Sequence, residues 1–198
     1  FCAGAYIYDR KTDRVHTYYA DKIIIASGGV GSIYKYTTNP EIATGDGYAM
    51  AFRAGASLVN MEYTQFHPTT LSIGEKRNFL ISEAVRGEGG IIINKKGMDF
   101  TRSYHKLGSL APRDIVSRAI IYELEKTGEN CVYLSLEKIK PDLIKKRFPN
   151  IYQICKQYNI DIRKEWIPIL PAFHFSCGGI LTDTYGKTTL KNLYSAGE

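Results

Sequence analysis

The chain has 198 residues, of which 44% are apolar and 23% are charged, with a net charge of +6 at pH 7. This composition excludes a disordered, collagen-like or disulfide-dominated chain. No run approaches the roughly 18 apolar residues of a membrane-spanning helix, so we expect no membrane segment. The sequence starts at Phe1 without an initiator methionine or signal-peptide features and stops at Glu198 just after a predicted strand. We therefore expect a piece of a longer chain.

The basic surplus does not predict nucleic-acid binding. The run Lys145-Lys146-Arg147 is more typical of a solvated helix face than of a phosphate-binding patch. A cationic pocket for a small anionic substrate would explain the surplus of basic residues equally well. The four cysteines show neither a CxxC pair nor the spacing of a zinc site. We expect reduced thiols, no metal and a cytoplasmic location.

The first third of the chain predicts an α/β unit. Residues 3–9 and 14–20 predict two strands joined by a turn. Residues 23–26 are apolar and rich in isoleucine, which predicts a parallel strand buried on both faces. That strand runs into the glycine-rich segment 27–31, and such a junction is where α/β sheets bind ligands. Asp46 is predicted to cap a helix that ends before Gly55.

The rest of the chain predicts several further elements. Pro112 is expected at the first position of a helix over 113–126, which Gly128 ends. The remaining expected elements are strands over 91–94, 179–183 and 193–196 and helices over 141–147 and 149–158.

Four cationic or titratable side chains occupy unusual settings: His67 before a proline, Arg86 between two glutamates, Arg113 in a first helical turn, and His174 in an apolar stretch. Two histidines and two arginines suit a substrate with two carboxylates, because arginine binds carboxylates bidentately and stays charged. Histidine can orient or polarise a carboxylate.

Each of these side chains also has a purely structural explanation. His67 and His174 could be core histidines with satisfied hydrogen bonds. Arg113 could form a helix-end ion pair with the neighbouring aspartate. Arg86 could belong to a surface salt-bridge cluster of little energetic value.

Six segments taken together resemble the fumarate reductase/succinate dehydrogenase flavoprotein family, over essentially the whole chain. These segments are ASGGVG (26–31), TTNPEIATGDG (37–47), QFHPT (65–69), LISEAVRGEG (80–89), LAPRDIVSRA (110–119) and HFSCGG (174–179). The LAPRD form and the cysteine before Gly-Gly favour the branch that oxidises L-aspartate to iminoaspartate in quinolinate and NAD synthesis. The alternatives are the fumarate reductase or succinate dehydrogenase branch and a binding module without catalysis.

The resemblance implies an α/β plus α+β fold, in which a Rossmann-type FAD-binding domain is interrupted by a capping domain. Residues 1–60 and 177–198 would belong to the FAD-binding domain, and residues 61–176 would form the capping domain. The implied cofactor is non-covalent FAD, with oxygen or fumarate as the electron acceptor and L-aspartate or another dicarboxylate as the substrate. The glycine-rich phosphate-binding fingerprint of the family is absent from these residues, so we expect this chain alone to retain no FAD and to be inactive.

The resemblance also assigns roles to individual residues. Arg113 would be the central catalytic residue, and Glu83 and Arg86 would form a polar relay leading to it. The substrate-binding residues would be His67, His174, Ser82 and Thr69. The cofactor-binding residues would be Gly28, Gly29, Asp46 and Glu198.

Overall fold

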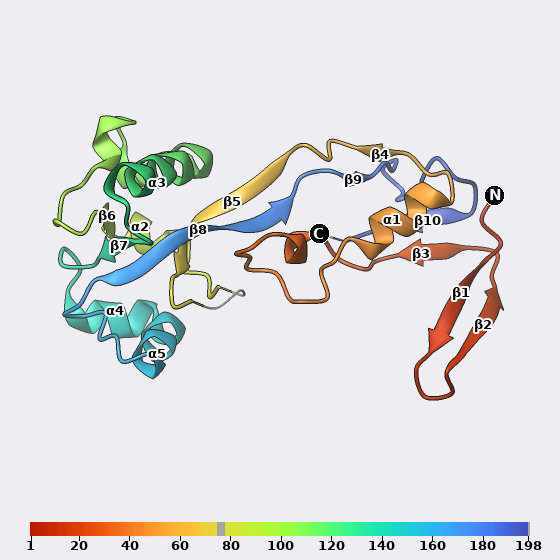
Figure 1. The fold of residues 1–198 in the computed structure, drawn as a ribbon, viewed down its shortest axis with the longest axis horizontal. Coiled ribbons are helices and arrows are strands. Elements are labelled where there is room, and N and C mark those ends of the chain that lie inside the picture. The colour runs from red at the N-terminus through yellow and green to blue at the C-terminus, as the bar shows by residue number, and fades with distance from the viewer. Residues whose placement is uncertain (75–77, 198) are drawn as a thin grey trace. The chain divides into compact units, whose positions relative to one another are not determined.

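The computed structural model describes residues 1–74 and 78–197, which form two compact units (Figure 1). The first unit contains residues 1–33, 41–64 and 175–197. The second contains residues 34–40 and the described part of 65–174.

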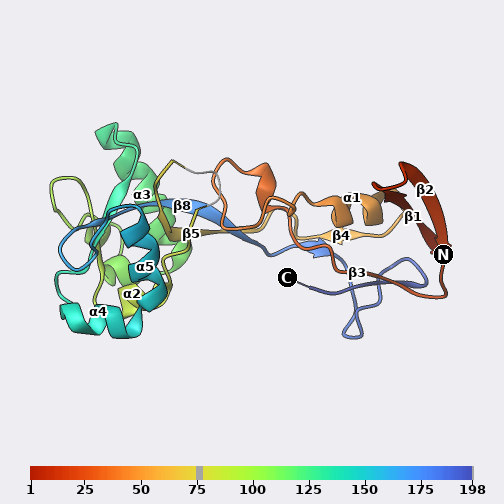
Figure 2. The ribbon, with the colours of Figure 1, turned by 90° about the horizontal axis from the view of Figure 1, so that it is seen from below.

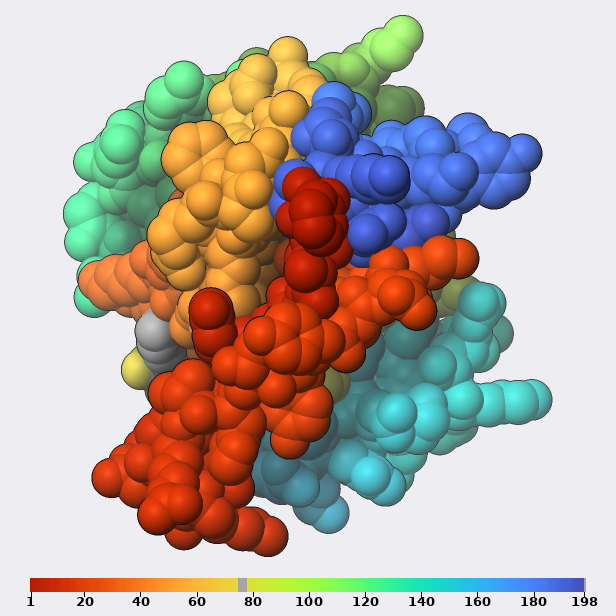
Figure 3. Space-filling view, turned by 90° about the vertical axis from the view of Figure 1, so that its right-hand side faces the viewer, coloured from red at the N-terminus to blue at the C-terminus, as the bar shows by residue number. Residues whose placement is uncertain are grey.

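The first unit begins with a β-hairpin of β1 (Gly4–Asp9) and β2 (Arg14–Tyr19), as the sequence predicts. The turn is held by Asp9, whose carboxylate accepts hydrogen bonds from the Lys11 backbone N–H at 2.8 Å and the Thr12 hydroxyl at 2.9 Å. The hairpin lies at the surface in the space-filling view (Figure 3).

A short parallel pair forms the centre of the first unit. β3 (Ile23–Ile25) pairs with β10 (Leu193–Ser195), and α1 (Asp46–Arg53) contributes Ala51 to the small core beside them. The predicted parallel pairing is confirmed, but burial on both faces is wrong because Ile24 is 67% exposed. Only the face that carries Ile23 and Ile25 packs against the core.

Helix α1 begins one residue earlier than the capping prediction requires. Gly45 holds the N-cap position with φ of 79°, and Asp46 lies in the first helical turn, so the prediction of Asp46 as the cap is wrong. Gly55 follows the helix end with φ of 95°, as predicted. A side chain at Gly47 would place its Cβ 2.0 Å from Ser27 Oγ, so only glycine allows α1 to approach the end of β3 this closely.

The unit is completed by β4 (Leu58–Val59), which pairs antiparallel with β9 (Gly179–Ile180), and by the 3-10 turn η1 (Gly31–Ile33). The returning strands are shorter than the predicted 179–183 and 193–196.

The second unit is built on a four-stranded sheet in the order β5-β8-β7-β6. Strands β5 (Thr64–Leu71) and β8 (Ile167–Ser176) run side by side in both ribbon views (Figures 1 and 2). β7 (Val132–Ser135) and β6 (Ile91–Ile93) follow in antiparallel pairing. The main core of the described residues lies on this sheet and includes Ile92, Leu134 and Ile169.

Helices cover the sheet. α3 (Arg113–Thr127) lies on one side of β8 in Figure 1, and α4 (Pro141–Arg147) and α5 (Pro149–Gln157) lie on the other. Pro112 is the N-cap of α3 rather than its first residue, and Gly128 ends the helix with φ of 70°. The short elements α2 (Glu83–Gly87), η2 (Thr101–Ser103) and η3 (Gly108–Leu110) complete the unit.

Candidate functional site

The site in the second unit is centred on Arg113, the first residue of α3. Its Nε donates a hydrogen bond to Glu83 Oε2 at 2.7 Å, and its Nη1 donates to Gln65 Oε1 at 2.7 Å. The helix-end pair with Asp114 is wrong, because Asp114 pairs with Arg118 instead. Two oxygen acceptors therefore hold the guanidinium in one orientation, while 33% of the side chain stays exposed.

Arg86 of α2 is buried next to the ion pair of Arg113 and Glu83. It is 1% exposed, and its Nη1 donates to the Ser109 carbonyl oxygen at 2.6 Å. Its Nη2 lies 3.6 Å from Glu83 Oε2, so one carboxylate oxygen faces two guanidinium groups. The alternative of a surface salt-bridge cluster is therefore wrong for Arg86.

These contacts set the protonation of the acidic and basic groups. The hydrogen bond from Arg113, more than the nearby charge of Arg86, lowers the pKa of Glu83 below its usual value. Burial lowers the pKa of Arg86. Glu83 is therefore a carboxylate at neutral pH, with 48% of its side chain exposed.

His67, on β5, is 1% exposed and neutral. The backbone N–H of Thr69 donates to its Nδ1 at 3.3 Å, so Nδ1 is an acceptor and Nε2 carries the proton. Burial, followed by the positive charge of Arg113, lowers the pKa of His67 to about 3. Charges on Arg86, Glu83 and His174 also act on this imidazole, which places it among the predicted site residues.

The low pKa of His67 predicts a specific pH dependence of stability. Between pH 6.5 and 3 the unfolded chain binds a proton at this histidine and the folded chain does not, so the free energy of unfolding falls as the pH decreases. Between pH 7 and 5, the native protein should lose about 2 kcal/mol more stability than His67→Gln. Urea unfolding at the two pH values measures the difference. Equal losses in both proteins would show that His67 is not held neutral.

His174 lies near the end of β8, beside His67. The two ring centroids are 5.4 Å apart and the rings are inclined by 68°. Thr38 Oγ1 lies 2.8 Å from His174 Nδ1, and the side-chain amide of Asn39 donates to the His174 carbonyl oxygen at 2.9 Å.

Three polar residues of this site were not singled out from the sequence: Gln65, Thr38 and Asn39. All three lie inside segments that carry the family resemblance, which was the only signal available. Uncharged polar side chains are common on any surface, so their residue types alone predict no site.

Two predicted substrate-binding residues have local structural roles. Ser82 is the N-cap of α2 and accepts a hydrogen bond from the Ala84 backbone N–H at 3.3 Å. Thr69 is fully buried, and its hydroxyl donates to the Ile81 carbonyl oxygen at 2.9 Å. The substrate contacts of Ser82 and Thr69 stay predictions.

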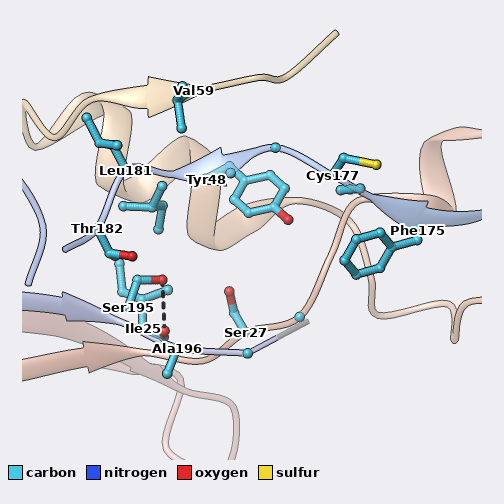
Figure 4. A pocket seen from close by; sticks show the side chains of 16 residues that line it. Ile25, Ser27, Tyr48, Val59, Phe175, Cys177, Leu181, Thr182, Ser195 and Ala196 are labelled. Carbon is cyan, nitrogen blue, oxygen red and sulfur yellow. Dashed lines mark hydrogen bonds between the residues drawn. The ribbon is translucent and has the colours of Figure 1, made fainter. Parts of the chain in front are cut away.

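A separate pocket of about 320 Å³ lies within the first unit, where the carboxyl ends of β3 and β10 meet (Figure 4). Ser27, Tyr48 and Cys177 line it, and the Ser195 hydroxyl bonds the Ile25 carbonyl oxygen at 3.3 Å at its edge. The predicted cofactor residue Gly28 also lines this pocket, with φ of 77° and open space where a Cβ would lie.

The lining of this pocket includes none of the other predicted cofactor residues. Gly29 and Asp46 do not line the pocket, and Glu198 lies outside the described residues.

Two further properties concern only the described residues, 1–74 and 78–197. Within them, no three His, Cys, Asp or Glu side chains are grouped to hold a metal ion. No helix in the same ranges has the length and hydropathy needed to cross a bilayer.

A mixed α/β fold with a pocket at the carboxyl ends of parallel strands agrees with the family comparison. The sequence matches the FAD binding domain family over residues 1–198, and the chain belongs to that family. It is 45% identical to L-aspartate oxidase of Yersinia pestis over 98% of the chain and 48% identical to L-aspartate oxidase 1 of Ralstonia nicotianae over 100%. The chain spans 37% of the length of each of these relatives.

Solved structures show the same fold. A quinol-fumarate reductase chain superposes with a TM-score of 0.83 and 36% identity, covering 93% of this chain and 35% of that one. Adenylylsulfate reductase from Archaeoglobus fulgidus superposes with a TM-score of 0.73 at 19% identity, covering 98% and 38%, which shows a shared fold alone.

Proposed function

We propose that the protein to which this chain belongs is an FAD-dependent oxidoreductase that converts L-aspartate to iminoaspartate. The observation that carries the proposal is the cluster of one oriented guanidinium, Arg113, beside the histidines His67 and His174. Whole-chain similarity to L-aspartate oxidases supports the choice of substrate.

In this proposal the second unit binds the dicarboxylate. Arg113 offers the N–H groups that Glu83 and Gln65 do not use, which suits a carboxylate. His67 adds an uncharged N–H donor. Such a clamp fixes the substrate's Cα–H in one orientation, and orientation is the protein's main contribution when a cofactor accepts the hydride.

Glu83 is suited to take part in proton transfer during the reaction. The substrate's ammonium group must lose a proton before an imine can form. Glu83 Oε2 accepts from Arg113 Nε, and the exposed part of the Glu83 side chain gives access to water. We assign Arg113 as the proton carrier: it passes its Nε proton to Glu83 Oε2 as a guanidinium nitrogen takes the proton that the substrate releases, and Glu83 then gives its proton to water. We assign Glu83 and Arg86 as the relay of Arg113.

FAD supplies hydride acceptance when it is bound, and the first unit has features that suit it. The pocket lies beyond the carboxyl ends of parallel strands, and Gly28 lets a ligand approach the backbone closely. We assign residues 1–60 and 177–198 to the FAD-binding domain, with Gly28, Gly29, Asp46 and Glu198 on the flavin side, and residues 61–176 to the capping domain.

The isolated 198-residue chain is not expected to retain FAD. A pocket of about 320 Å³ is at the lower end of the range for drug-sized ligands, so it has room for only part of a dinucleotide. After gel filtration the purified chain should show little flavin absorbance. Close to one equivalent of bound flavin would contradict this expectation.

The function is tested by assaying the full-length protein with L-aspartate and oxygen or fumarate. We expect hydrogen peroxide to form with L-aspartate and oxygen, and much less with D-aspartate, whose Cα–H points the other way in the same carboxylate clamp. A second candidate, fumarate reduction, is favoured by the structural match to quinol-fumarate reductase. Fumarate reduction by a low-potential dye, without aspartate oxidation, would replace the first proposal with the second. Absence of both activities in the FAD-loaded protein would favour a binding module.

A further inference from the structure

The 3-10 turn η3 holds Arg86 through a single backbone group. Arg86 Nη1 donates to the Ser109 carbonyl oxygen at 2.6 Å, whereas Nε and Nη2 have no hydrogen-bond acceptor among the described residues. Arg86 Nη2 lies 3.6 Å from Glu83 Oε2, which is close enough for an ion pair but too far for a hydrogen bond. The position of this buried guanidinium relative to Glu83 therefore depends on where η3 places one carbonyl oxygen.

The Ser109 hydroxyl connects η3 to two neighbouring elements. Ser109 is 6% exposed, and its hydroxyl oxygen accepts from the Ile92 backbone N–H of β6 at 2.9 Å. The same oxygen lies within hydrogen-bond distance, 3.3 Å, of the Thr101 hydroxyl of η2. Thr101 is buried and donates to Asp99 Oδ1 at 2.6 Å. One buried serine thus ties the turn that holds Arg86 to the sheet and to η2.

Gly108 allows η3 to pack closely against η2. Its φ is 54°, and a Cβ at this position would lie 3.0 Å from Arg102 Cγ and 3.3 Å from Thr101 Oγ1. Close packing of this kind leaves little room for η3 to move while the Ser109 hydroxyl keeps its partners.

We propose that Ser109 is a positioning residue of the relay: its hydroxyl fixes η3, so that its carbonyl oxygen holds the Arg86 guanidinium beside Glu83. The inference rests on the proposed function for its effect on turnover, because Arg86 and Glu83 are the proposed relay of Arg113. The hold on Arg86 itself rests only on the contacts of Ser109.

The consequence for the reaction is that Arg86 helps to keep Glu83 ionised. The charged or titratable groups that act on Glu83 are Arg113 of α3, Arg86 of α2 and His67 of β5. The hydrogen bond from Arg113 lowers the pKa of Glu83 most, and the charge of Arg86 lowers it further. If Arg86 moves away, more of Glu83 is protonated, and a protonated carboxyl cannot accept the proton of Arg113. Turnover should therefore fall while substrate affinity changes little, because neither Ser109 nor Arg86 is a proposed substrate ligand.

The effect on turnover is tested with the FAD-loaded full-length protein and its Ser109→Ala variant. We expect kcat for L-aspartate to fall about 10-fold, the equivalent of one lost hydrogen bond, with KM within about two-fold of native. The acidic limb of the kcat profile should move to higher pH by about 0.5–1 unit, because Glu83 loses part of its opposite charge. A purely structural defect would lower the amount of active protein without moving this limb.

Ser135→Ala is the matched control. Ser135 is also buried, its hydroxyl accepts a backbone N–H at 3.4 Å, and its strand β7 pairs with β6. Its kcat and pH profile should match those of the native protein. Equal shifts in Ser135→Ala and Ser109→Ala would overturn the inference.

Thr101→Val is a second variant that tests the link between Ser109 and η2. It leaves the Ile92 N–H bonded to Ser109, so it should fold and show a smaller change of kcat and of the acidic limb in the same direction. An acidic limb at its native position in both Ser109→Ala and Thr101→Val would overturn the inference. If Ser109→Ala does not fold, a native limb in Thr101→Val alone would do so.

A double-mutant cycle with Arg86→Met tests the hold on Arg86 independently of activity. In urea unfolding, Ser109→Ala and Arg86→Met together should destabilise the protein by less than the sum of the two single losses, because both disrupt the same hydrogen bond. Additive losses would show that Ser109 does not hold Arg86 and would overturn the inference. Coupled losses in a native protein that does not oxidise L-aspartate would instead overturn the proposed function and leave the hold on Arg86 intact.

Discussion

Replacement of Arg113 by leucine is expected to lower kcat/KM for L-aspartate by about 10²–10⁴, the usual contribution of a proton-transferring group. The variant should nevertheless fold, because the side chain is one-third exposed and its partner Glu83 can be solvated. Steady-state aspartate oxidation by the FAD-loaded full-length protein measures the loss. Thermal unfolding of the same sample shows whether the fold is retained.

Arg118→Leu provides the matched control for this substitution. Arg118 lies on the same helix, is largely exposed and pairs with Asp114 rather than with a site residue. Exposed pairs of this kind contribute little to stability, so its turnover should stay within about two-fold of native. Near-normal aspartate turnover in Arg113→Leu would show that Arg113 is not the central catalytic residue.

Local sequence signals predicted much of the secondary structure. The helix over 113–126, the helices over 141–147 and 149–158 and the hairpin of β1 and β2 all lie within a few residues of their predicted bounds. These elements are specified by nearby residues: prolines at or just before helix starts, a glycine after α3, and a turn held by Asp9.

The two longest strands were not predicted. β5 contains Pro68, and β8 contains Pro168 and Pro171, and a proline within an apolar run normally argues against a strand. Their pairing joins residues about a hundred positions apart, as in the bond from the Thr70 hydroxyl to the Leu170 carbonyl oxygen. Consecutive residues are buried over much of both strands, so neither segment shows the apolar–polar alternation of a half-exposed strand.

For the site, the sequence predicted which residues take part but not which residues they contact. Their settings in the sequence singled out Arg113 and His67, and the family resemblance added Glu83. The structure places these three residues close enough to interact. The sequence did not predict that Gln65 would hold Arg113, nor that Thr38 would contact His174. Those partners come from separate strands and loops, so only the folded chain brings them together.

Arg86→Ala should be the most destabilising single change in the polar cluster. The side chain is fully buried, and its removal leaves the Ser109 carbonyl oxygen without its donor and opens a cavity beside Glu83. A lost buried hydrogen bond and a large-to-small cavity together predict a decrease of about 2–4 kcal/mol in the free energy of unfolding. Guanidinium-chloride unfolding monitored by circular dichroism measures this decrease.

The expected loss is limited because the native environment of Arg86 is itself imperfect. Within residues 1–74 and 78–197, Nε and Nη2 of Arg86 lack a hydrogen-bond acceptor, so the substitution also removes a desolvation cost. Arg102→Ala is the control, because its guanidinium is exposed and pairs with Asp99 at 3.2 Å, which predicts a change below about 1 kcal/mol. If Arg86→Ala were no less stable than Arg102→Ala, the buried Arg86 guanidinium would not hold α2 against the Ser109 backbone. The relay to Arg113 would then be the only role left for Arg86.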